Sequence, residues 1–585
     1  MSKVRLPFPI HPPSWLAKTR RLVRSSELLF VAVAIAIGSG AGLLTLLQGA
    51  VALFLQQWLF RFPDTLRLSA LPSLRPMQLI LLPVGGLVLS AFTLVTVARR
   101  REMVDAVEAN ALHGGRMSPP DSLILSGQTI LSNGFGASVG LEAAYVQLGS
   151  VLSSWAGRWL NLRRADLRIL VGAGAGAAIA AAFGAPLAGA FYAFEIVIGA
   201  YTPSAIAPVV AAALAGTQVA QRLGAAPYIV SVPVGPAIHV FGYLVYAGLG
   251  LICALLGIVL MQAVAWAEQN SRRLIPGWLR PPLGGLLLVP LAFLSPQVLS
   301  AGHGALHLDL AVALPLDVLA ALIVIKALAA IISLGFGFRG GLFFASLFLG
   351  TLVGHLYAEL AGWLAGMPVL NAGNAAMVGM AGLAVAIVGG PFTMAMLVLE
   401  ATGNFSLTGA VLAAALVSST VVRELFGYSF STWRLHLRGE TIRSARDVGW
   451  VKMLTAGRMM RRESQTVSPD TTVAEFRRRF PLGSVSRVVL VDEAGRYAGI
   501  VTPAAVFAGT DTAVPVGSLA TTLDVALLPD MDINEITRLF DASQMDELAV
   551  LDEEGHVLGT LSDKFVRKRY ADELEKAQRD LFREL

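Results

Sequence analysis

Glu142 is the only charged residue between Ser122 and Gly157. The stretch around it, SNGFGASVGLEAAYVQLGS, is apolar and broken by glycines. A carboxylate is costly in such surroundings, and inside a membrane segment it is a functional residue by default. Two interpretations follow: Glu142 gates a site for anions, or it caps its own helix or pairs with a buried base. The cost of burying it favours the gate.

The segment around Glu142 has a counterpart in the second half of the chain. GFGASVGLEAAYVQLG (134–149) aligns without a gap on GFGFRGGLFFASLFLG (335–350), with eight of the sixteen positions identical. A second pair follows in the same order, GAPLAGAFYAFE (184–195) and GGPFTMAMLVLE (389–400). Close helix packing alone would explain scattered glycines, but not two ordered, gapless repeats. Duplicated membrane halves of this kind predict an ion or substrate site between them, near the midplane.

The motifs SVGLEAA and RGGLFFA are typical of helices that begin inside a membrane. The first N–H groups of a helix lack partners, and the helix dipole adds about half a positive charge there. Such an end attracts an anion. Two facing starts would replace part of the water shell of a halide. Glu142 carries the same charge as the anion, so it would occupy that site itself or leave it when protonated.

Long apolar windows must position these motifs. The 585 residues are 55% hydrophobic and 14% charged, whereas ordinary soluble proteins have roughly 25% charged residues. The uncharged window Leu28–Phe60 is long enough to cross a bilayer at a tilt. Six basic residues precede it, which predicts a cytoplasmic N-terminus rather than nucleic-acid binding. The single cysteine, Cys253, leaves no intrachain disulfide and no cysteine metal site.

Composition changes near residue 435, where charges become frequent. Beyond it, VVLVDEAGRYAGIVT (488–502) matches LAVLDEEGHVLGTLS (548–562), and each copy predicts a strand, an acidic glycine turn and a second strand. The duplication resembles a tandem pair of CBS domains, at about 451–510 and 515–570 within 451–585. The final segment KRYADELEKAQRDLFREL predicts an amphipathic helix. Residues 1–26 would be a cytoplasmic segment, 27–435 a transmembrane domain with halves at about 27–225 and 236–435, and 436–450 a linker.

The membrane motifs resemble the CLC family of chloride channels and chloride/proton exchangers. The family pattern G-[KR]-E-G-P-x-x-Q-x-G corresponds to GLEAAYVQLG, and G-x-F-x-P corresponds to GLFFA. The resemblance places Glu142 at the gating glutamate. It implies a polytopic α-helical membrane protein with two inverted-topology repeats, followed by a soluble α/β CBS pair. The anion-binding residues that it implies are Gly140, Leu141, Ala143, Gly341, Leu342, Phe343 and Ser431.

The resemblance also implies partners and a location. It predicts a homodimer with one anion pathway in each subunit, in the inner (plasma) membrane of a bacterium, with both termini cytoplasmic. The transported species would be chloride or another inorganic anion, with or without protons. The protein would be a transporter and not an enzyme, and it would need no cofactor.

Two regions near the expected site depart from the family pattern. The serine of G-S-G-I-P falls in ARRREMVDAVEANAL (98–112), which has no serine, and the helix start is expected at residues 100–102. There Arg101 either attracts anions or belongs to a solvated loop. Arg339 either adds positive field at the second helix start or pairs with an acid such as Glu359. The family's gating tyrosine corresponds to Ser431 in a gapless register, and to Tyr428 after a shift.

The residue that hands protons to the cytoplasm in the exchangers of the family corresponds to Ile196 here. Glu195 precedes it, and Glu400 takes the same place in the other half, so both are expected to cap or bridge helices. The missing acid favours a passive channel. A proton-coupled exchanger is the alternative, and a membrane-embedded anion sensor that signals to the CBS pair is a further one.

Two other groups of residues bear on ligands. CBS pairs that bind adenine nucleotides hold the ribose with an aspartate three residues after a Thr or Ser. Thr502 and Ser562 are followed at that distance by Ala505 and Phe565, so nucleotide binding by the usual contacts is not expected. The segment SAGHGALHLDL has a His-x3-His-x-Asp spacing, but a polar loop outside the membrane is the preferred interpretation over a metal site.

Overall fold

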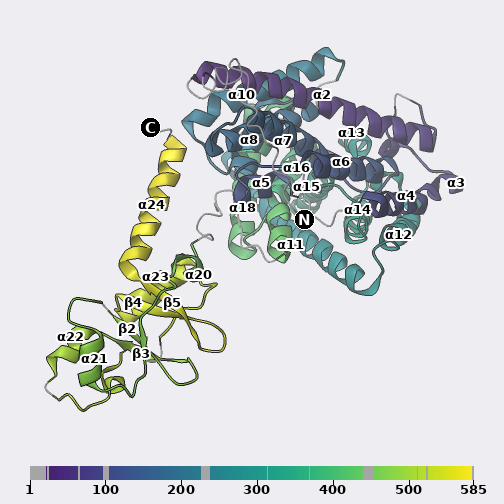
Figure 1. Cartoon of the computed structure of the whole chain (residues 1–585). Coiled ribbons are helices and arrows are strands. Elements are labelled where there is room, and N and C mark those ends of the chain that lie inside the picture. Colours follow the sequence, from purple (N-terminus) through teal and green to yellow (C-terminus); the bar gives the residue numbers. More distant parts are fainter. Residues whose placement is uncertain are drawn as a thin grey trace. The chain divides into compact units, whose positions relative to one another are not determined.

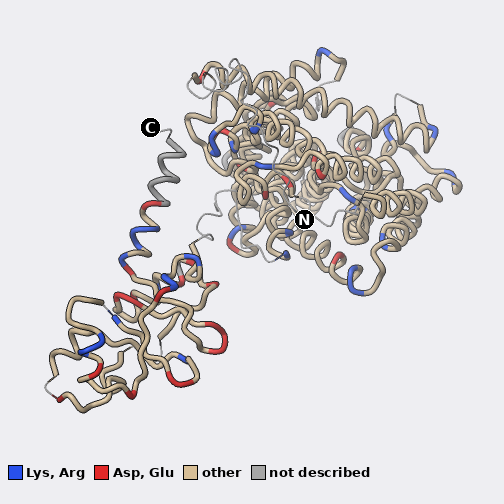
Figure 2. The backbone as a smooth tube through the Cα atoms, in the orientation of Figure 1, with Lys and Arg blue, Asp and Glu red and all other residues tan. Residues whose placement is uncertain are grey.

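The uncharged windows of the sequence form helices in the computed structural model. It describes residues 22, 26–63, 66–96, 104–225, 238–311, 314–367, 369–438, 454–485, 487–509, 511–521 and 525–582. Among these residues, eight helices have the length and composition to cross a membrane. The chain divides into two units, 1–447 and 448–585. Charged residues are sparse over the first unit and frequent over the second (Figure 2).

The first half of the helical unit runs from α2 to α10 (Figure 1). Its elements are α2 Glu27–Phe60, η1 Leu68–Ala70, α3 Pro76–Leu79, α4 Leu81–Thr96, α5 Ala106–Leu112, α6 Pro119–Gly134, α7 Glu142–Trp159, α8 Arg164–Phe183, α9 Pro186–Tyr192, the π-helical η2 Ala193–Ile198 and α10 Pro203–Arg222. Prolines stand at the first turns of α6, α9 and α10, where the missing N–H costs nothing.

The second half repeats this order. Its elements are α11 Val240–Leu274, α12 Arg280–Leu294, η3 Pro296–Val298, α13 His303–Ala311, α14 Leu316–Gly335, α15 Phe343–Ala365, α16 Ala372–Val388, α17 Pro391–Thr402, α18 Phe405–Leu425 and α19 Phe430–Leu437. The pairings α7–α8, α8–α10 and α2–α10 of the first half recur as α15–α16, α16–α18 and α11–α18. The halves meet where α4 packs on α12 and α9 packs on α17.

Paired glycines allow close helix crossings, and they recur in both halves. A Cβ added to Gly149 of α7 would lie 2.3 Å from the carbonyl oxygen of Gly174 on α8. A Cβ added to Gly350 of α15 would lie 2.3 Å from the carbonyl oxygen of Gly379 on α16. These backbones are therefore in direct contact, as is common for small residues in membrane helices. The repeat seen in the sequence is thus a repeat in packing.

The second unit holds two similar hairpins. Its elements are α20 Ala456–Met459, β1 Thr466–Val467, α21 Val473–Arg479, β2 Val488–Val491, β3 Tyr497–Val501, α22 Pro503–Ala508, η5 Val516–Leu519, α23 Ile533–Ser543, β4 Glu547–Leu551, β5 Val557–Ser562 and α24 Asp563–Phe582. Strand β1 pairs parallel to β2, and β2–β3 and β4–β5 are antiparallel. Both hairpins carry a register shift at the same place, after Leu490 and Val550. The predicted terminal helix is confirmed as part of α24.

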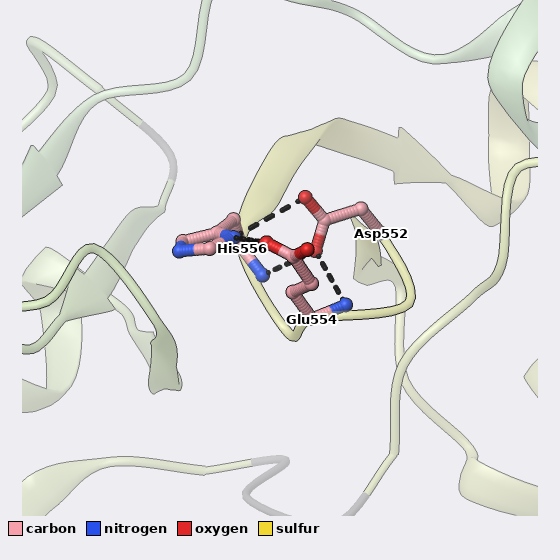
Figure 3. A group of neighbouring side chains, drawn as sticks. All are labelled: Asp552, Glu554 and His556. Carbon is pink, nitrogen blue, oxygen red and sulfur yellow. Dashed lines mark hydrogen bonds and ion pairs between the residues drawn. The ribbon is translucent and has the colours of Figure 1, made fainter.

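The hairpin turns are built alike in the two copies. Asp492 Oδ1 accepts the N–H of Arg496 at 2.8 Å, and Asp552 Oδ1 accepts the N–H of His556 at 2.8 Å. In the second copy Asp552, Glu554 and His556 cluster, and their side chains point toward one another (Figure 3). The first copy makes the same turn with an arginine, which is no metal ligand. Turn bonding therefore accounts for the cluster.

The prediction of a polar loop at His303–Asp309 is wrong. These residues form α13, where Asp309 is buried and His303 is partly buried, and the His303 ring stacks on Phe344 with 3.5 Å between centroids. The hydroxyl oxygen of Ser69, from η1, accepts the N–H groups of Gly304 and Ala305 and so caps the helix. A cap supplied from 235 residues away in the chain leaves no local signal.

Candidate anion site between the two halves

The two helix starts expected to face one another do so. Gly140 and Gly341 form an antiparallel bridge: the Gly140 N–H donates to the Gly341 carbonyl at 3.0 Å, and the Gly341 N–H donates back at 3.3 Å. Helix α7 begins two residues after the first glycine, at Glu142, and α15 begins two residues after the second, at Phe343. Leu141 and Leu342 are their N-cap residues, and neither supplies a side-chain cap.

The carboxyl group of Glu142 is folded back onto this bridge. A Cβ added to Gly140 would lie 1.9 Å from Glu142 Oε2, and one added to Gly341 would lie 3.7 Å from the same oxygen. The carboxyl group also lies against the backbone N–H groups of Glu142 itself and of Phe344. It is therefore held between the starts of α7 and α15, which is where an anion would gain most from both helix ends.

Burial leaves part of the Glu142 carboxyl unsatisfied. The residue is 4% exposed, and Oε2 has no hydrogen-bond partner among the described residues. A structural cap would be expected to satisfy its oxygens, because an unpaired buried polar atom is costly. Ala143 lies opposite Gly341, with its Cβ 3.8 Å from a Cβ added there. A glycine and an alanine therefore face one another beside the carboxyl group.

Aromatic side chains surround the start of α15. Phe343 is 6% exposed, and its ring lies 5.4 Å from Phe183 and 6.4 Å from Tyr192, between centroids. Tyr192 was not singled out in the sequence. The charges that act on its hydroxyl are those of Asp105 and Glu142, and the hydroxyl has no hydrogen-bond partner among the described residues. Tyr192 is the last residue of α9, three residues before Glu195. In the sequence, only this closeness to Glu195 indicates that Tyr192 could lie near the anion site.

A buried lysine also lies close to the helix starts. Lys326 of α14 is 1% exposed. Its Nζ donates to Ser138 Oγ at 3.0 Å and to the carbonyl oxygens of Val298 and Ser300 at 3.0 and 3.2 Å, which satisfies all three N–H groups of an ammonium. Ser138 stands two residues before Gly140 of the bridge, so the lysine is bonded to the segment that leads into α7. The sequence signal was present, because Lys326 is the only charged residue between Asp317 and Arg339.

Glu195 and Glu400 are confirmed as helix caps. Glu195 accepts the N–H groups of Phe392 and Thr393, at the start of α17, at 3.1 and 2.8 Å. Glu400 accepts the N–H groups of Leu187 and Ala188, at the start of α9, at 2.8 and 2.9 Å. Each glutamate therefore caps the helix that leads to, or carries, the other glutamate.

The arrangement above matches a known family over most of the helical unit. The family model described as voltage gated chloride channel matches residues 85–423, and the CBS domain model matches residues 456–508. The chain belongs to the CLC family. One relative of this CLC protein is the voltage-gated ClC-type chloride channel ClcB of Citrobacter koseri. The two are 29% identical over 387 residues, which are 64% of this chain and 91% of the relative.

Solved structures show the same fold. A slow cyanobacterial Cl⁻/H⁺ antiporter has a TM-score of 0.60 and 23% identity, over 70% of this CLC chain and 97% of the antiporter. A eukaryotic CLC transporter also has a TM-score of 0.60, with 19% identity over 94% of this chain and 98% of the transporter. The predicted fold class, a CLC-type helical membrane unit followed by a CBS pair, is confirmed.

The helix that should carry the serine of the CLC pattern begins later than expected. Helix α5 begins at Ala106, not at residues 100–102, because Asp105 is its N-cap and accepts the Glu108 N–H at 2.8 Å. Arg101 lies outside the described residues. Ser431 and Tyr428 line a cavity of about 210 Å³ together with Glu195, and the lining of that cavity includes neither Glu142 nor Phe343. The Tyr428 hydroxyl lies 3.2 Å from Nδ1 of His436.

Arg339 does not lie beside Glu359. It stands between α14 and α15, where its backbone N–H donates to Ser132 Oγ at 2.9 Å. Its charged neighbours are Glu268, Arg272, Arg280 and Arg434. Arg339 therefore belongs to a larger group of basic residues in this CLC protein, which is described below.

Proposed function

We propose that this CLC protein is a channel for chloride or a similar inorganic anion, gated by Glu142. The observation that carries the proposal is the position of the Glu142 carboxyl, buried on the Gly140–Gly341 bridge between two helix starts. A carboxylate there competes with an anion for the same N–H groups. When the carboxyl is protonated it loses that advantage, and the anion takes its place.

The anion-binding residues that we propose are the same as those expected from the sequence, with Tyr192 added. The main chain at the starts of α7 and α15 would contact the anion, and it belongs to Gly140, Leu141, Ala143, Gly341, Leu342 and Phe343. Tyr192 would add a hydroxyl group beside Phe343. We keep Ser431 as a residue of the path toward Glu195, where it lines a cavity. Arg101 stays a proposed anion-attracting residue without a structural account.

A proton-coupled exchanger is the second candidate. The cyanobacterial protein of known structure, which is 23% identical to this chain, is a Cl⁻/H⁺ antiporter. This chain has Ile196 where exchangers carry an acid, but the carboxyls of Asp105 and Glu142 both act on the Tyr192 hydroxyl. If the Tyr192 hydroxyl relays a proton between these two carboxyls, the proton route does not pass through residue 196.

We also propose that the protein is a homodimer in a bacterial inner membrane, with both termini cytoplasmic. The support is the CLC family membership and the six basic residues before α2. Each subunit would then hold its own pathway, because the bridge and both helix starts come from one chain.

Reconstitution in liposomes tests these readings. Chloride efflux without proton movement would support the channel, and efflux in fixed stoichiometry with proton uptake would establish the exchanger. If the protein is an exchanger, Asp105→Asn should abolish its proton uptake. Protein that folds as a dimer but moves no anion would contradict both and favour an anion sensor that acts on the CBS pair.

A further inference from the structure

A basic pocket of about 420 Å³ lies in the helical unit, between α4, the end of α11, the start of α12 and α19. The charged residues that line it, among those described, are Arg272, Arg280, Arg339, Arg434 and Glu268. Four arginines against one glutamate give a formal charge of +3. Neither Glu142 nor Phe343 lines the pocket, so it is distinct from the site between the helix starts.

Pairing within this arginine pocket is incomplete. Glu268 Oε1 accepts a hydrogen bond from Arg272 at 2.5 Å and lies 3.7 Å from an Nη of Arg434. The guanidinium groups of Arg280 and Arg339 make no hydrogen bond or ion pair with any described residue, and Nε of Arg280 is buried without a partner. Partly buried charges without partners are costly. An anionic ligand would satisfy both groups.

The size and lining of the arginine pocket indicate the ligand class. Its volume falls in the roughly 300–1,000 Å³ range of small-molecule sites, and a single halide would fill little of it. Guanidinium groups present a planar fork that fits the oxygens of phosphate. The rim is apolar, with Trp278 54% and Leu94 67% exposed. Aromatic residues at a membrane interface and basic pockets between membrane helices are typical of phospholipid headgroup contacts.

We propose that the arginine pocket binds a phosphate group, through Arg280 and Arg339. The phosphate comes either from the headgroup of an anionic phospholipid or from free inorganic phosphate. The apolar rim favours the lipid, because acyl chains would lie against it. This site goes beyond anion transport, and binding to it is measured without any flux.

Thermal unfolding of the purified full-length protein in mild detergent tests the proposal. Phosphatidylglycerol is titrated against phosphatidylcholine, and sodium phosphate against sodium chloride at equal ionic strength. The test variant is Arg280→Gln combined with Arg339→Gln. The control is Arg273→Gln, which removes a charge from the same end of α11 outside the pocket lining.

We expect phosphatidylglycerol to stabilise the native protein and the control, and to require an about tenfold higher concentration in the double variant, as for a lost charge-assisted hydrogen bond. If sodium phosphate also stabilises the native protein more strongly than the double variant, the ligand is free phosphate. If only phosphatidylglycerol does so, the ligand is the lipid headgroup. Should the double variant fold poorly, Arg280→Lys keeps the charge but loses the fork and should bind several-fold more weakly. A double variant that responds like the native protein, or equal stabilisation by phosphatidylcholine or chloride, overturns the proposal.

Discussion

Glu195 and Glu400 cap each other's helices across the boundary between the two halves. Glu195 follows α9 and binds the start of α17, whereas Glu400 lies near the end of α17 and binds the start of α9. Each carboxylate meets the positive end of a helix dipole, which stabilises both the helix and the charge. The pair therefore joins the halves by two equivalent contacts related by the internal repeat.

The first prediction concerns this pair. Glu195→Gln or Glu400→Gln keeps the shape but removes the charge at the helix start, so each should lower stability by about 1 kcal/mol. Thermal unfolding should show the loss, while the ratio of chloride to nitrate flux stays unchanged. Glu424→Gln, on an exposed site of α18, is the matched control. Unchanged stability with specific loss of proton coupling would instead make Glu195 a proton carrier.

The second prediction concerns Glu142. Protonation removes the charge that competes with the anion, so anion flux should rise as pH falls. Glu142→Gln mimics the neutral form and should preserve or raise flux while flattening its pH dependence. Glu142→Ala should act in the same way, because only the charge has to go. If both variants form dimers but conduct no anions, or keep the native pH response, Glu142 is a structural cap.

The third prediction concerns Lys326. Lys326→Met keeps a long apolar side chain but leaves Ser138 and two carbonyl oxygens without their donor, at a cost of about 1–3 kcal/mol. It also removes a positive charge near the helix starts, so chloride flux should fall. Lys326→Arg keeps the charge and should recover flux more than stability. Native flux in a folded Lys326→Met protein would show that the lysine serves packing alone.

The fourth prediction concerns the second CBS hairpin. The backbone N–H of His556, together with that of Glu554 and the His556 side chain, lowers the pKa of Asp552 below its usual value. A lowered carboxyl pKa stabilises the folded turn above the unfolded pKa, and the gain is lost as pH falls through the folded pKa. Asp552→Asn should therefore speed amide hydrogen exchange in the turn at neutral pH, and the difference should vanish in acid.

The matched control for the turn is Glu553→Gln, which removes an exposed charge one residue away and should leave exchange unchanged. Asp492→Asn should reproduce the effect in the first copy, because the pKa of Asp492 is lowered by the backbone N–H of Arg496. Equal exchange in all the variants would mean that the carboxylates do not hold the turns.

The fifth prediction concerns nucleotides. The Thr502 hydroxyl accepts the N–H of Ala505 and so caps α22, while Phe565 stands at the equivalent place on α24 and is 47% exposed. Neither position offers a carboxylate for a ribose. ATP, ADP or AMP should therefore change the unfolding temperature little. Stabilisation of several degrees, abolished by substitutions between the two CBS copies, would contradict this.

Internal repeats made most of the fold predictable. The gapless alignment around Glu142 and Phe343 predicted two facing helix starts, and the bridge between Gly140 and Gly341 shows that they face one another. The same reasoning predicted the caps formed by Glu195 and Glu400. These inferences succeeded because a repeat records geometry directly: two copies of one structure, related by an internal axis, must present the same positions to each other.

Contacts between segments without a repeat were not predictable. The Ser69 cap of α13 joins residues far apart in sequence, so the His303 segment looked like a loop. The alternative that Arg339 pairs with Glu359 failed for the same reason, because α11 and α19 place Glu268 and Arg434 around it instead. Lys326 differs from these cases: its isolation in an apolar window was visible, and the rule applied to Glu142 would have found it.

The bridge between Gly140 and Gly341 also limits how this protein can move. Both hydrogen bonds of the bridge join main chain from one half to main chain from the other. Rocking the halves apart, as many transporters do, would break both bonds and leave these main-chain groups without their partners. We therefore expect the two halves to stay fixed relative to one another while an anion passes. The part that moves would be the carboxyl group of Glu142, by rotation of its side chain, rather than a domain.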